Sequence, residues 1–157
     1  MVLADNSKKR RERVIRYAPL LIWIGIIFFL SSNNGSMSET SLFIGPLLHF
    51  LFPNAPEATI QAYHGFIRKC AHFGVYFVLA VLAVRALRPM SPMWKFAVAI
   101  VMVAAIASLD EFNQSFEASR TSSAWDVALD CVGGVAGIAA ATFIYRRFAK
   151  EPRQSVS

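Results

Sequence analysis

An apolar run between residues 65 and 84 carries side chains whose chemistry is unusual in such a setting. Lys69, His72 and Tyr76 follow the spacing i, i+3 and i+7, so a helix would place all three on one face. Lysine offers a positive charge, and histidine exchanges a proton near neutral pH. Arg68 lies about 100° away around such a helix and is expected to extend towards lipid headgroups. This face could therefore bind an anion or take part in acid–base chemistry.

Two later apolar runs carry acids and an amide at helical spacings. These side chains are Asp110, Glu111 and Gln114, which follow the run 94–109, and Asp126 and Asp130, which begin the run 124–145. Arg120 lies in the short link between the two runs. Asp126 and Asp130 share a helix face with Gly133 and Gly137, whose spacing allows a second backbone to approach closely. The carboxylates of the last run are therefore expected to face other helices rather than lipid.

Four apolar segments approach the length of a bilayer span. They are 14–32, 65–84, 94–109 and 124–145. A span needs about 20 mostly apolar residues, and a backbone in lipid must satisfy its own hydrogen bonds, so each segment predicts a helix. The apolar stretch 41–52 is too short to cross and is interrupted by Gly45 and Pro46, which predicts an interfacial segment. The predicted fold class is an all-α membrane protein with four transmembrane helices and an interfacial segment between helices 1 and 2.

The placement of positive charge predicts the orientation of these helices. Most of the 16 Lys and Arg residues lie in three stretches, namely 8–16, 85–95 and 146–153. The positive-inside rule assigns such stretches to the cytoplasmic side, so we expect a multi-pass protein of the bacterial inner membrane with both termini in the cytoplasm. The predicted organisation is a basic cytoplasmic flank over 1–13, a four-helix transmembrane domain over 14–147 and a cytoplasmic tail over 148–157.

The beginning of the chain also fits a second interpretation. A basic stretch followed by a short apolar run is typical of a secretory signal peptide. Residues 31–38 contain no Ala-x-Ala cleavage site, which favours a first helix that is retained. The same basic stretch could contact nucleic acid, but the flank of a membrane helix explains it more simply, so no nucleic-acid partner is predicted.

The predicted orientation brings the polar side chains of three helices to one depth. The second and fourth helices enter from the outer face and the third exits there, so these side chains all lie in the outer half of the membrane. A charge at the bilayer centre costs about 2.5–3.5 kcal/mol, and buried ion pairs rarely stabilise a protein relative to apolar replacements. The sequence therefore predicts an outward-facing polar pocket that serves a function.

The order and spacing of these motifs resemble those of the VanZ-like family of small bacterial membrane proteins. The resemblance covers roughly 65–140 and rests on Lys69-x-x-His72-Phe73, Glu111-x-x-Gln114-x-Phe116-x-x-x-Arg120, Asp126, and Asp130-x-x-Gly133-x-x-x-Gly137. The family is named for a member associated with resistance to the glycopeptide antibiotic teicoplanin, so the resemblance implies a family-level link to glycopeptide resistance. It also implies that the charged, amide and histidine positions of these motifs are site residues. Asp130 stands where many members have Asn and adds a charge.

The predicted pocket suits an anionic or hydroxyl-bearing compound at the outer leaflet. Its expected ligand-binding residues are Lys69, Tyr76, Gln114, Arg120 and Asp130. Lysine and arginine hold phosphate or carboxylate groups, while amides and carboxylates hold hydroxyls or amines. The expected partners are membrane lipids, a lipid-linked envelope precursor or a lipoglycopeptide, and further copies of the same chain. The expected function is to bind the polar part of an envelope lipid or lipid-like compound.

Whether the pocket also catalyses a reaction stays open. An enzyme would use His72, Glu111 and Asp126 for acid–base chemistry, with Lys69 or Arg120 stabilising negative charge. The serines of the third helix and its outer link lie in no nucleophile motif. A metal site built from the same histidine and two acids would have few ligands and an adjacent lysine, so no metal and no cofactor are predicted. The remaining alternatives are a structural or partner-binding membrane protein and a small transporter.

Overall fold

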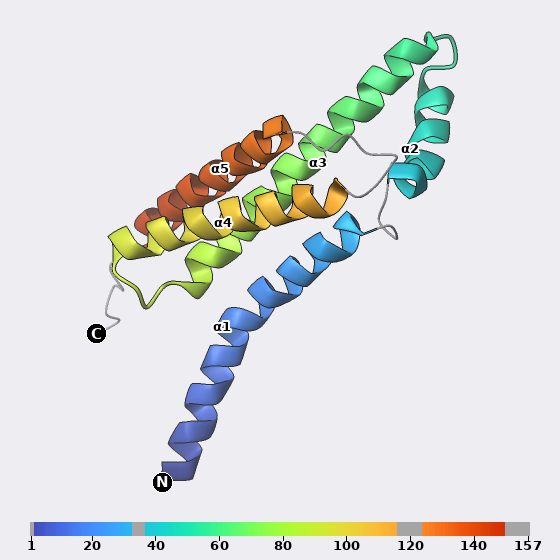
Figure 1. Ribbon diagram of the computed structural model, residues 1–157. Coiled ribbons are helices and arrows are strands. Elements are labelled where there is room, and N and C mark those ends of the chain that lie inside the picture. Colours follow the sequence, from blue (N-terminus) through green and yellow to red (C-terminus); the bar gives the residue numbers. More distant parts are fainter. Residues whose placement is uncertain (1, 33–36, 116–123, 150–157) are drawn as a thin grey trace, which may run out of the picture.

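The computed structural model describes residues 2–32, 37–115 and 124–149, which form five helices (Figure 1). The helices are α1 (Val2–Ser31), α2 (Met37–Leu51), α3 (Glu57–Ala86), α4 (Pro92–Gln114) and α5 (Ala124–Ala149). Four of them, α1, α3, α4 and α5, are long and apolar enough to cross a membrane. The shorter α2 separates the first two spans along the chain. The predicted fold class, four spans with a short segment between the first two, is confirmed.

Proline residues lie at both ends of α3 and at the start of α4. Pro56 precedes α3, and Glu57 places an acid in its first turn, where it complements the helix dipole. α3 ends at Ala86, shortly before Pro89. α4 begins after Ser91 with Pro92 in its first turn, where the missing N–H of proline is not needed. The tight α3–α4 connection therefore follows directly from its two prolines.

α2 begins earlier than the predicted interfacial segment and continues through Gly45 and Pro46. It returns to the start of α3 through a short turn, and the two helices are in contact. Phe52 after α2 packs against Tyr63 of α3 with ring centroids 5.2 Å apart. Across the same junction, His49 Nε2 lies 3.5 Å from a carboxylate oxygen of Glu57. α2 thus packs against the N-terminal end of α3.

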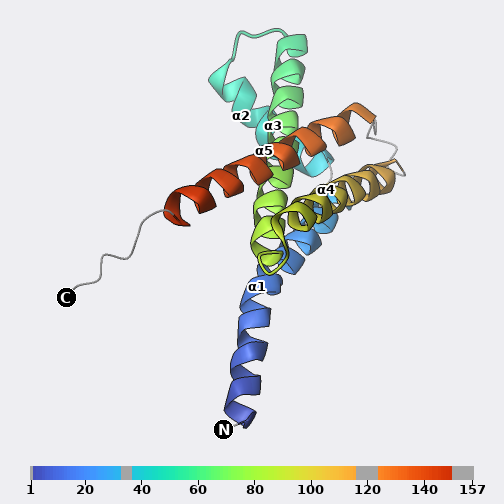
Figure 2. The same cartoon turned by 90° about the vertical axis from the view of Figure 1, so that its left-hand side faces the viewer.

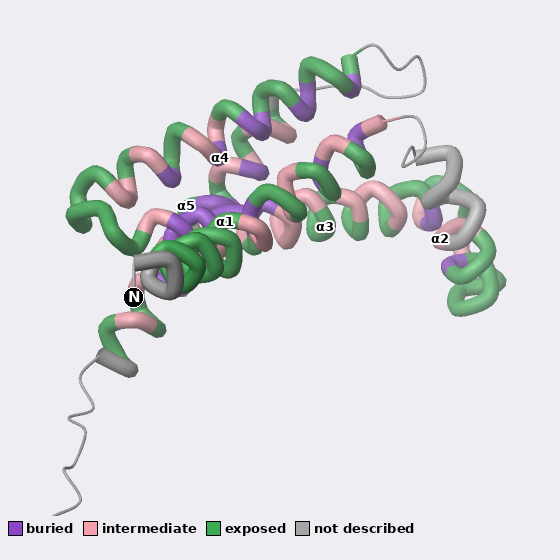
Figure 3. The backbone as a smooth tube through the Cα atoms, turned by 90° about the horizontal axis from the view of Figure 1, so that it is seen from below, coloured by how far each residue is buried: buried purple, intermediate pink, exposed green. Residues whose placement is uncertain are grey.

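α3 is the central helix, because it contacts all four others and packs most extensively against α5 (Figures 1 and 2). α4 also contacts α5 and the C-terminal part of α1, where Ser31 and Asn113 are hydrogen-bonded. The N-terminal part of α1 extends away from the other helices in both views. Figure 3 shows that buried residues concentrate on α3, α4 and α5, whereas residues 6–15 of α1 are exposed. The mutual packing of α3, α4 and α5 therefore forms the core of the molecule.

Two glycines of α5 bring its backbone against α3, as the sequence predicted. A Cβ atom added at Gly133 would lie 2.5 Å from the carbonyl oxygen of Phe73, and one added at Gly137 would collide with the carbonyl oxygen of Phe77. Gly134 instead faces the side chain of Val103 on α4. Glycines at such positions allow transmembrane helices to pack at close range. This close approach carries the polar face of α5 into the helix bundle.

Large apolar side chains cover the outside of the spans. Leu21 on α1, Phe66 on α3, Val101 on α4 and Phe143 on α5 are each between 64% and 67% exposed. A water-soluble domain of this size would bury many of these groups, whereas lipid solvates them without cost. The exposed apolar surface therefore agrees with the four membrane spans.

Candidate functional site

Buried polar side chains gather where α3, α4 and α5 meet. They are Tyr76 on α3, Asp110, Glu111 and Gln114 on α4, and Asp130 on α5. Tyr76 and Asp130 have no exposed surface, and the other three are at most 5% exposed. We call these five residues, together with Arg68 and His72 at their edge, the polar cluster. It lies inside helices that otherwise bury alanine, valine, leucine and isoleucine.

Asp110 is the centre of a hydrogen-bonded chain within the polar cluster. Tyr76 Oη donates to Asp110 Oδ2 at 2.9 Å, and Gln114 Nε2 donates to Asp110 Oδ1 at 3.1 Å. Arg68 Nη2 in turn donates to Gln114 Oε1 at 3.2 Å. Gln114 thus uses both ends of its amide. The chain runs from a fully buried phenol to a half-buried guanidinium.

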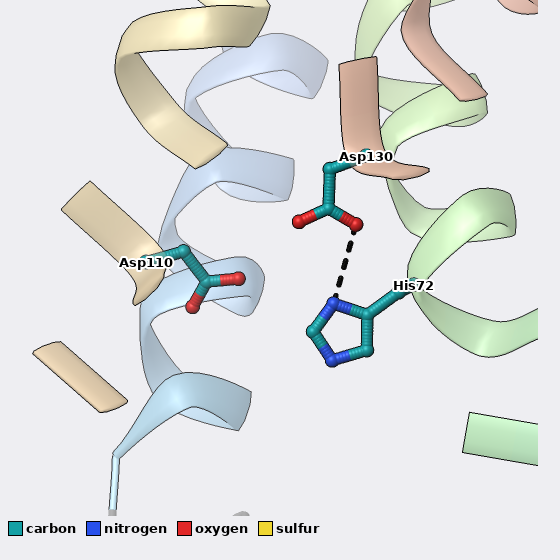
Figure 4. A group of neighbouring side chains, drawn as sticks. All are labelled: His72, Asp110 and Asp130. Atoms are coloured by element: carbon teal, nitrogen blue, oxygen red, sulfur yellow. Dashed lines mark hydrogen bonds and ion pairs between the residues drawn. The ribbon is translucent and has the colours of Figure 1, made fainter. Parts of the chain in front are cut away.

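A second contact joins α3 to α5. His72 Nδ1 lies 3.2 Å from Asp130 Oδ1, and the histidine side chain is 17% exposed while that of Asp130 is fully buried (Figure 4). The other carboxylate oxygen, Asp130 Oδ2, has no hydrogen-bond partner within the described part of the chain. Figure 4 shows this carboxylate facing that of Asp110 across the space beside the imidazole. The pair orients His72 through a buried carboxylate, an arrangement suited to acid–base chemistry.

His72, Asp110 and Asp130 also bring ligand atoms together. One ligand atom from each residue lies within 4.8 Å of the other two. Imidazole nitrogen and carboxylate oxygen are both donor types that divalent transition metals accept. The metal site weighed from the sequence combined His72 with Glu111 and Asp126, whereas the group in the structure combines His72 with Asp110 and Asp130.

The structure brings four of the predicted site residues into direct contacts of the polar cluster. His72, Tyr76, Gln114 and Asp130 all take part in its hydrogen bonds. Glu111 is buried on α4 beside Asp110. Asp126 is partly buried in the first turn of α5, one turn before Asp130. Arg120, a predicted ligand-binding residue, lies outside the described residues.

Arg68 and Lys69 lie in the opposite positions to those predicted from the sequence, since Arg68 faces the cluster and Lys69 does not. Lys69 is exposed, and Arg68 is the half-buried side chain that reaches Gln114. Arg68, His72 and Tyr76 are spaced four residues apart and form one row along α3, which is the row that meets α4 and α5. The expected placement of Lys69 on the inner wall, based on the three-residue spacing to His72, is therefore wrong.

Asp110 is the residue that the predicted site lacked. Its four-residue spacing to Gln114 is visible in the sequence and corresponds to the observed hydrogen bond between the two side chains. Ser31 Oγ also donates to the backbone carbonyl of Asp110 at 3.4 Å, so the end of α1 contacts the same turn of α4. Asn113 Nδ2 donates to Ser31 Oγ at 3.1 Å. All four long helices thus meet at or next to the polar cluster.

The chain matches one protein-family model over residues 17–145, described as VanZ/LLP1. The match covers the C-terminal half of α1, all of α3 and α4, most of α5 and every residue of the polar cluster. No significant match was found among curated proteins or among solved structures. The resemblance seen in the sequence motifs is confirmed: the chain belongs to the VanZ/LLP1 family and is a multi-pass membrane protein with four candidate spans.

Proposed function

We propose that this VanZ/LLP1 family member binds the polar part of an envelope lipid or lipid-like compound at the polar cluster. The observation that carries the proposal is the chain of contacts from buried Tyr76 through Asp110 and Gln114 to half-buried Arg68. It begins among membrane-spanning helices and ends in a cation at the edge of the cluster. Because the Arg68 side chain is only half-buried, it is the point of this chain that an anionic headgroup could contact.

Energetic cost supports a binding role for the polar cluster. Ionisable groups inside membrane spans are expensive to insert and are by default candidates for function. Replacing buried ion pairs with apolar residues is often neutral or stabilising, so stability alone explains such a cluster poorly. Three acids, an arginine and a histidine at one meeting point of helices therefore point to a ligand.

Arg68 is the group best suited to meet that ligand. Its described contact is with the neutral amide oxygen of Gln114, which uses one of five guanidinium N–H groups. A guanidinium holds phosphate or carboxylate through paired hydrogen bonds that a lysine cannot reproduce. The ligand class we propose is thus a compound with an apolar tail and a phosphate or carboxylate near the membrane surface.

We propose the orientation that the positive-inside rule predicts, which would put the polar cluster in the outer half of the bacterial inner membrane. The basic residues Arg85, Arg88 and Lys95 at the α3–α4 connection and Arg146 and Arg147 at the end of α5 support it. Figure 1 shows that this connection and the end of α5 lie at the same end of the bundle, and that the N-terminal part of α1 extends towards that side. Lipid-linked envelope precursors and lipoglycopeptides are exposed at the opposite, outer leaflet, where they could reach the cluster. This placement would also account for the family's association with glycopeptide resistance.

Native mass spectrometry of the chain released from mild detergent tests this function. Wild-type protein should carry an adduct of lipid mass, and Arg68→Gln should lose most of it. Lys69→Gln is the matched control, because it removes a positive charge from the adjacent, exposed position. Equal adducts in wild type and Arg68→Gln would contradict the proposal and favour a structural or partner-binding role. The same spectra report whether the chain forms a homo-oligomer.

The His72–Asp130 pair favours a second candidate function, processing of the bound compound. A buried carboxylate that orients an imidazole is the arrangement of a general base, with Glu111 and Asp126 as further acids on α4 and α5. If the chain is an enzyme, His72→Asn should retain the lipid adduct of the wild type but abolish its conversion. Conversion that continues unchanged in His72→Asn would contradict catalysis by this pair.

A further inference from the structure

Three potential metal ligands from three helices face one another inside the polar cluster (Figure 4). His72 comes from α3, Asp110 from α4 and Asp130 from α5. Asp110 and Asp130 are at most 4% exposed, and the histidine side chain is 17% exposed. The group therefore has two buried oxygen donors and one nitrogen donor nearer the surface.

Asp130 supplies an independent sign that something is held between these side chains. Its carboxylate is fully buried, yet Oδ2 has no hydrogen-bond partner among the described residues. A buried polar atom without a partner costs about 1–3 kcal/mol, so such atoms call for an explanation. Because the carboxylate faces that of Asp110, a cation between the two would satisfy the free oxygen and the like charges together.

We infer that His72, Asp110 and Asp130 form a binding site for a divalent transition metal ion such as Zn²⁺. A metal with ligand bonds of about 2.0–2.2 Å needs neighbouring ligand atoms roughly 3.3–3.6 Å apart. The 3.2 Å separation of His72 Nδ1 and Asp130 Oδ1 is close to this spacing, and a metal held by both atoms would take the place of their hydrogen bond. The widest separation in the group, within 4.8 Å, requires a contraction of about 1 Å, which rotation of a carboxylate supplies.

The donor set decides which metal class fits. Mg²⁺ and Ca²⁺ prefer oxygen ligands, whereas one imidazole with two carboxylates suits Zn²⁺, Mn²⁺ or Fe²⁺. The hydrogen bonds from Tyr76 and Gln114 to Asp110 hold its carboxylate in place without using all its lone pairs, as supporting groups around metal sites do. Arg68 donates to Gln114, and its positive charge also acts on His72. The neighbouring acids Glu111 and Asp126 add negative charge around the site.

Three protein ligands leave a coordination position open. Sites of this kind accept water or an oxygen atom of a substrate as a further ligand, and the metal can polarise that oxygen. A phosphate or carboxylate oxygen of the bound compound could occupy the position. This last step rests on the proposed function, whereas metal binding itself does not require a lipid.

Equilibrium titration with Zn²⁺ tests the site. The chain, purified in mild detergent with any polyhistidine tag removed and metal stripped by a chelator, would compete with a chromophoric chelator for the ion. We expect one Zn²⁺ per chain in the wild type. Asp130→Asn and His72→Gln should each weaken binding at least tenfold, since the loss of even a supporting partner costs 10–100-fold in other metal sites.

Two controls separate this site from adventitious binding. His49→Gln removes the histidine of the exposed His49–Glu57 contact, a pair able to hold zinc weakly, and should leave the affinity unchanged. The thermal midpoint of each metal-free variant shows whether that variant is folded. If Asp130→Asn does not fold, the affinity of His72→Gln, a substitution at the edge of the cluster, is the test of the site. The inference would be overturned if the wild type bound no Zn²⁺, or if wild type, Asp130→Asn and His72→Gln bound it with equal affinity. It would also be overturned if only His49→Gln lost Zn²⁺ affinity. Lipid adducts measured with chelator present show whether lipid binding persists without metal.

Discussion

At the scale of single residues, the state of the polar cluster depends on Asp110. Its two carboxylate oxygens accept hydrogen bonds from different helices, Tyr76 on α3 and Gln114 on α4. A buried carboxylate is strongly destabilising when it loses a partner, because the interior offers no water in exchange. The Tyr76–Asp110 hydrogen bond therefore helps to determine which face of α3 packs against α4.

Tyr76→Phe should destabilise the chain because it deletes that contact and leaves Asp110 Oδ2 without its donor. The expected loss in free energy of unfolding is about 1–3 kcal/mol, the usual cost of an unsatisfied buried polar group. Thermal unfolding in detergent measures it as a lower midpoint. Tyr63→Phe is the matched control, since Tyr63 lies on the same helix with 42% of its surface exposed. Equal midpoints for the two variants would show that the contact contributes nothing.

That these residues lie at one level along the bundle could be predicted from the sequence, but which face of α3 meets the other helices could not. Depth follows from where each apolar run begins and ends, which placed His72, Gln114 and Asp130 in one layer. Rotation follows from which row of α3 meets its neighbours, and rows at three- and four-residue spacing are both available to a helix. The row that packs against α4 and α5 is the one that contains Arg68, and Lys69 is therefore exposed.

At the scale of elements, close packing of α3 and α5 positions the cluster. Gly133 and Gly137 lie against the backbone at Phe73 and Phe77, one turn apart on each helix. This contact continues the same face of α5 that carries Asp130 towards His72. A wider separation of α3 and α5 would move the His72 and Asp130 side chains further apart.

Gly137→Ala should therefore weaken the packing of α3 and α5, because its Cβ would meet the backbone oxygen of Phe77. Overpacking of this kind costs about 1–3 kcal/mol. Gly74→Ala is the control: nothing lies within 4 Å of its added Cβ, and alanine favours a helix over glycine by about 1 kcal/mol. We expect a lower thermal midpoint for the first variant and an equal or higher one for the second. A midpoint for Gly137→Ala at or above that of Gly74→Ala would contradict close packing.

Some bounds were predictable for local reasons, whereas α1 begins at Val2, twelve residues before the predicted span 14–32. Pro89 and Pro92 determine the α3–α4 connection, and the apolar runs determine the spans. α2 is different, because Gly45 and Pro46 indicated an interruption whereas the helix Met37–Leu51 contains both. Contact with the start of α3 stabilises α2, and tertiary contact of this kind overrides weak helix propensity.

At the scale of the whole molecule, the distribution of charge ties the proposed function to one orientation. The net charge is +6, and the basic residues gather in the N-terminal flank, the α3–α4 connection and the end of α5. Anionic lipid headgroups of the cytoplasmic leaflet attract such segments by about 1 kcal/mol per Lys or Arg. The exposed and basic N-terminal part of α1 extends away from the bundle, as a flank that meets such a surface would.

Labelling of single introduced cysteines would determine that orientation. In a background with Cys70→Ala and Cys131→Ala, cysteine would replace Asn6 on the flank, Ser91 at the α3–α4 connection or Asn54 between α2 and α3. A membrane-impermeant maleimide should label Asn54→Cys in cells with an intact inner membrane, and the other two only after permeabilisation. All three positions are exposed, and Ser91 makes no side-chain capping bond, so little stability should be lost. The inverse pattern would place the polar cluster in the cytoplasmic half, because Asp110 and Gln114 lie in the last two turns of α4, at the opposite end from Ser91. An outer-leaflet precursor or lipoglycopeptide could then not reach Arg68, whereas Zn²⁺ binding would be unaffected by the inversion.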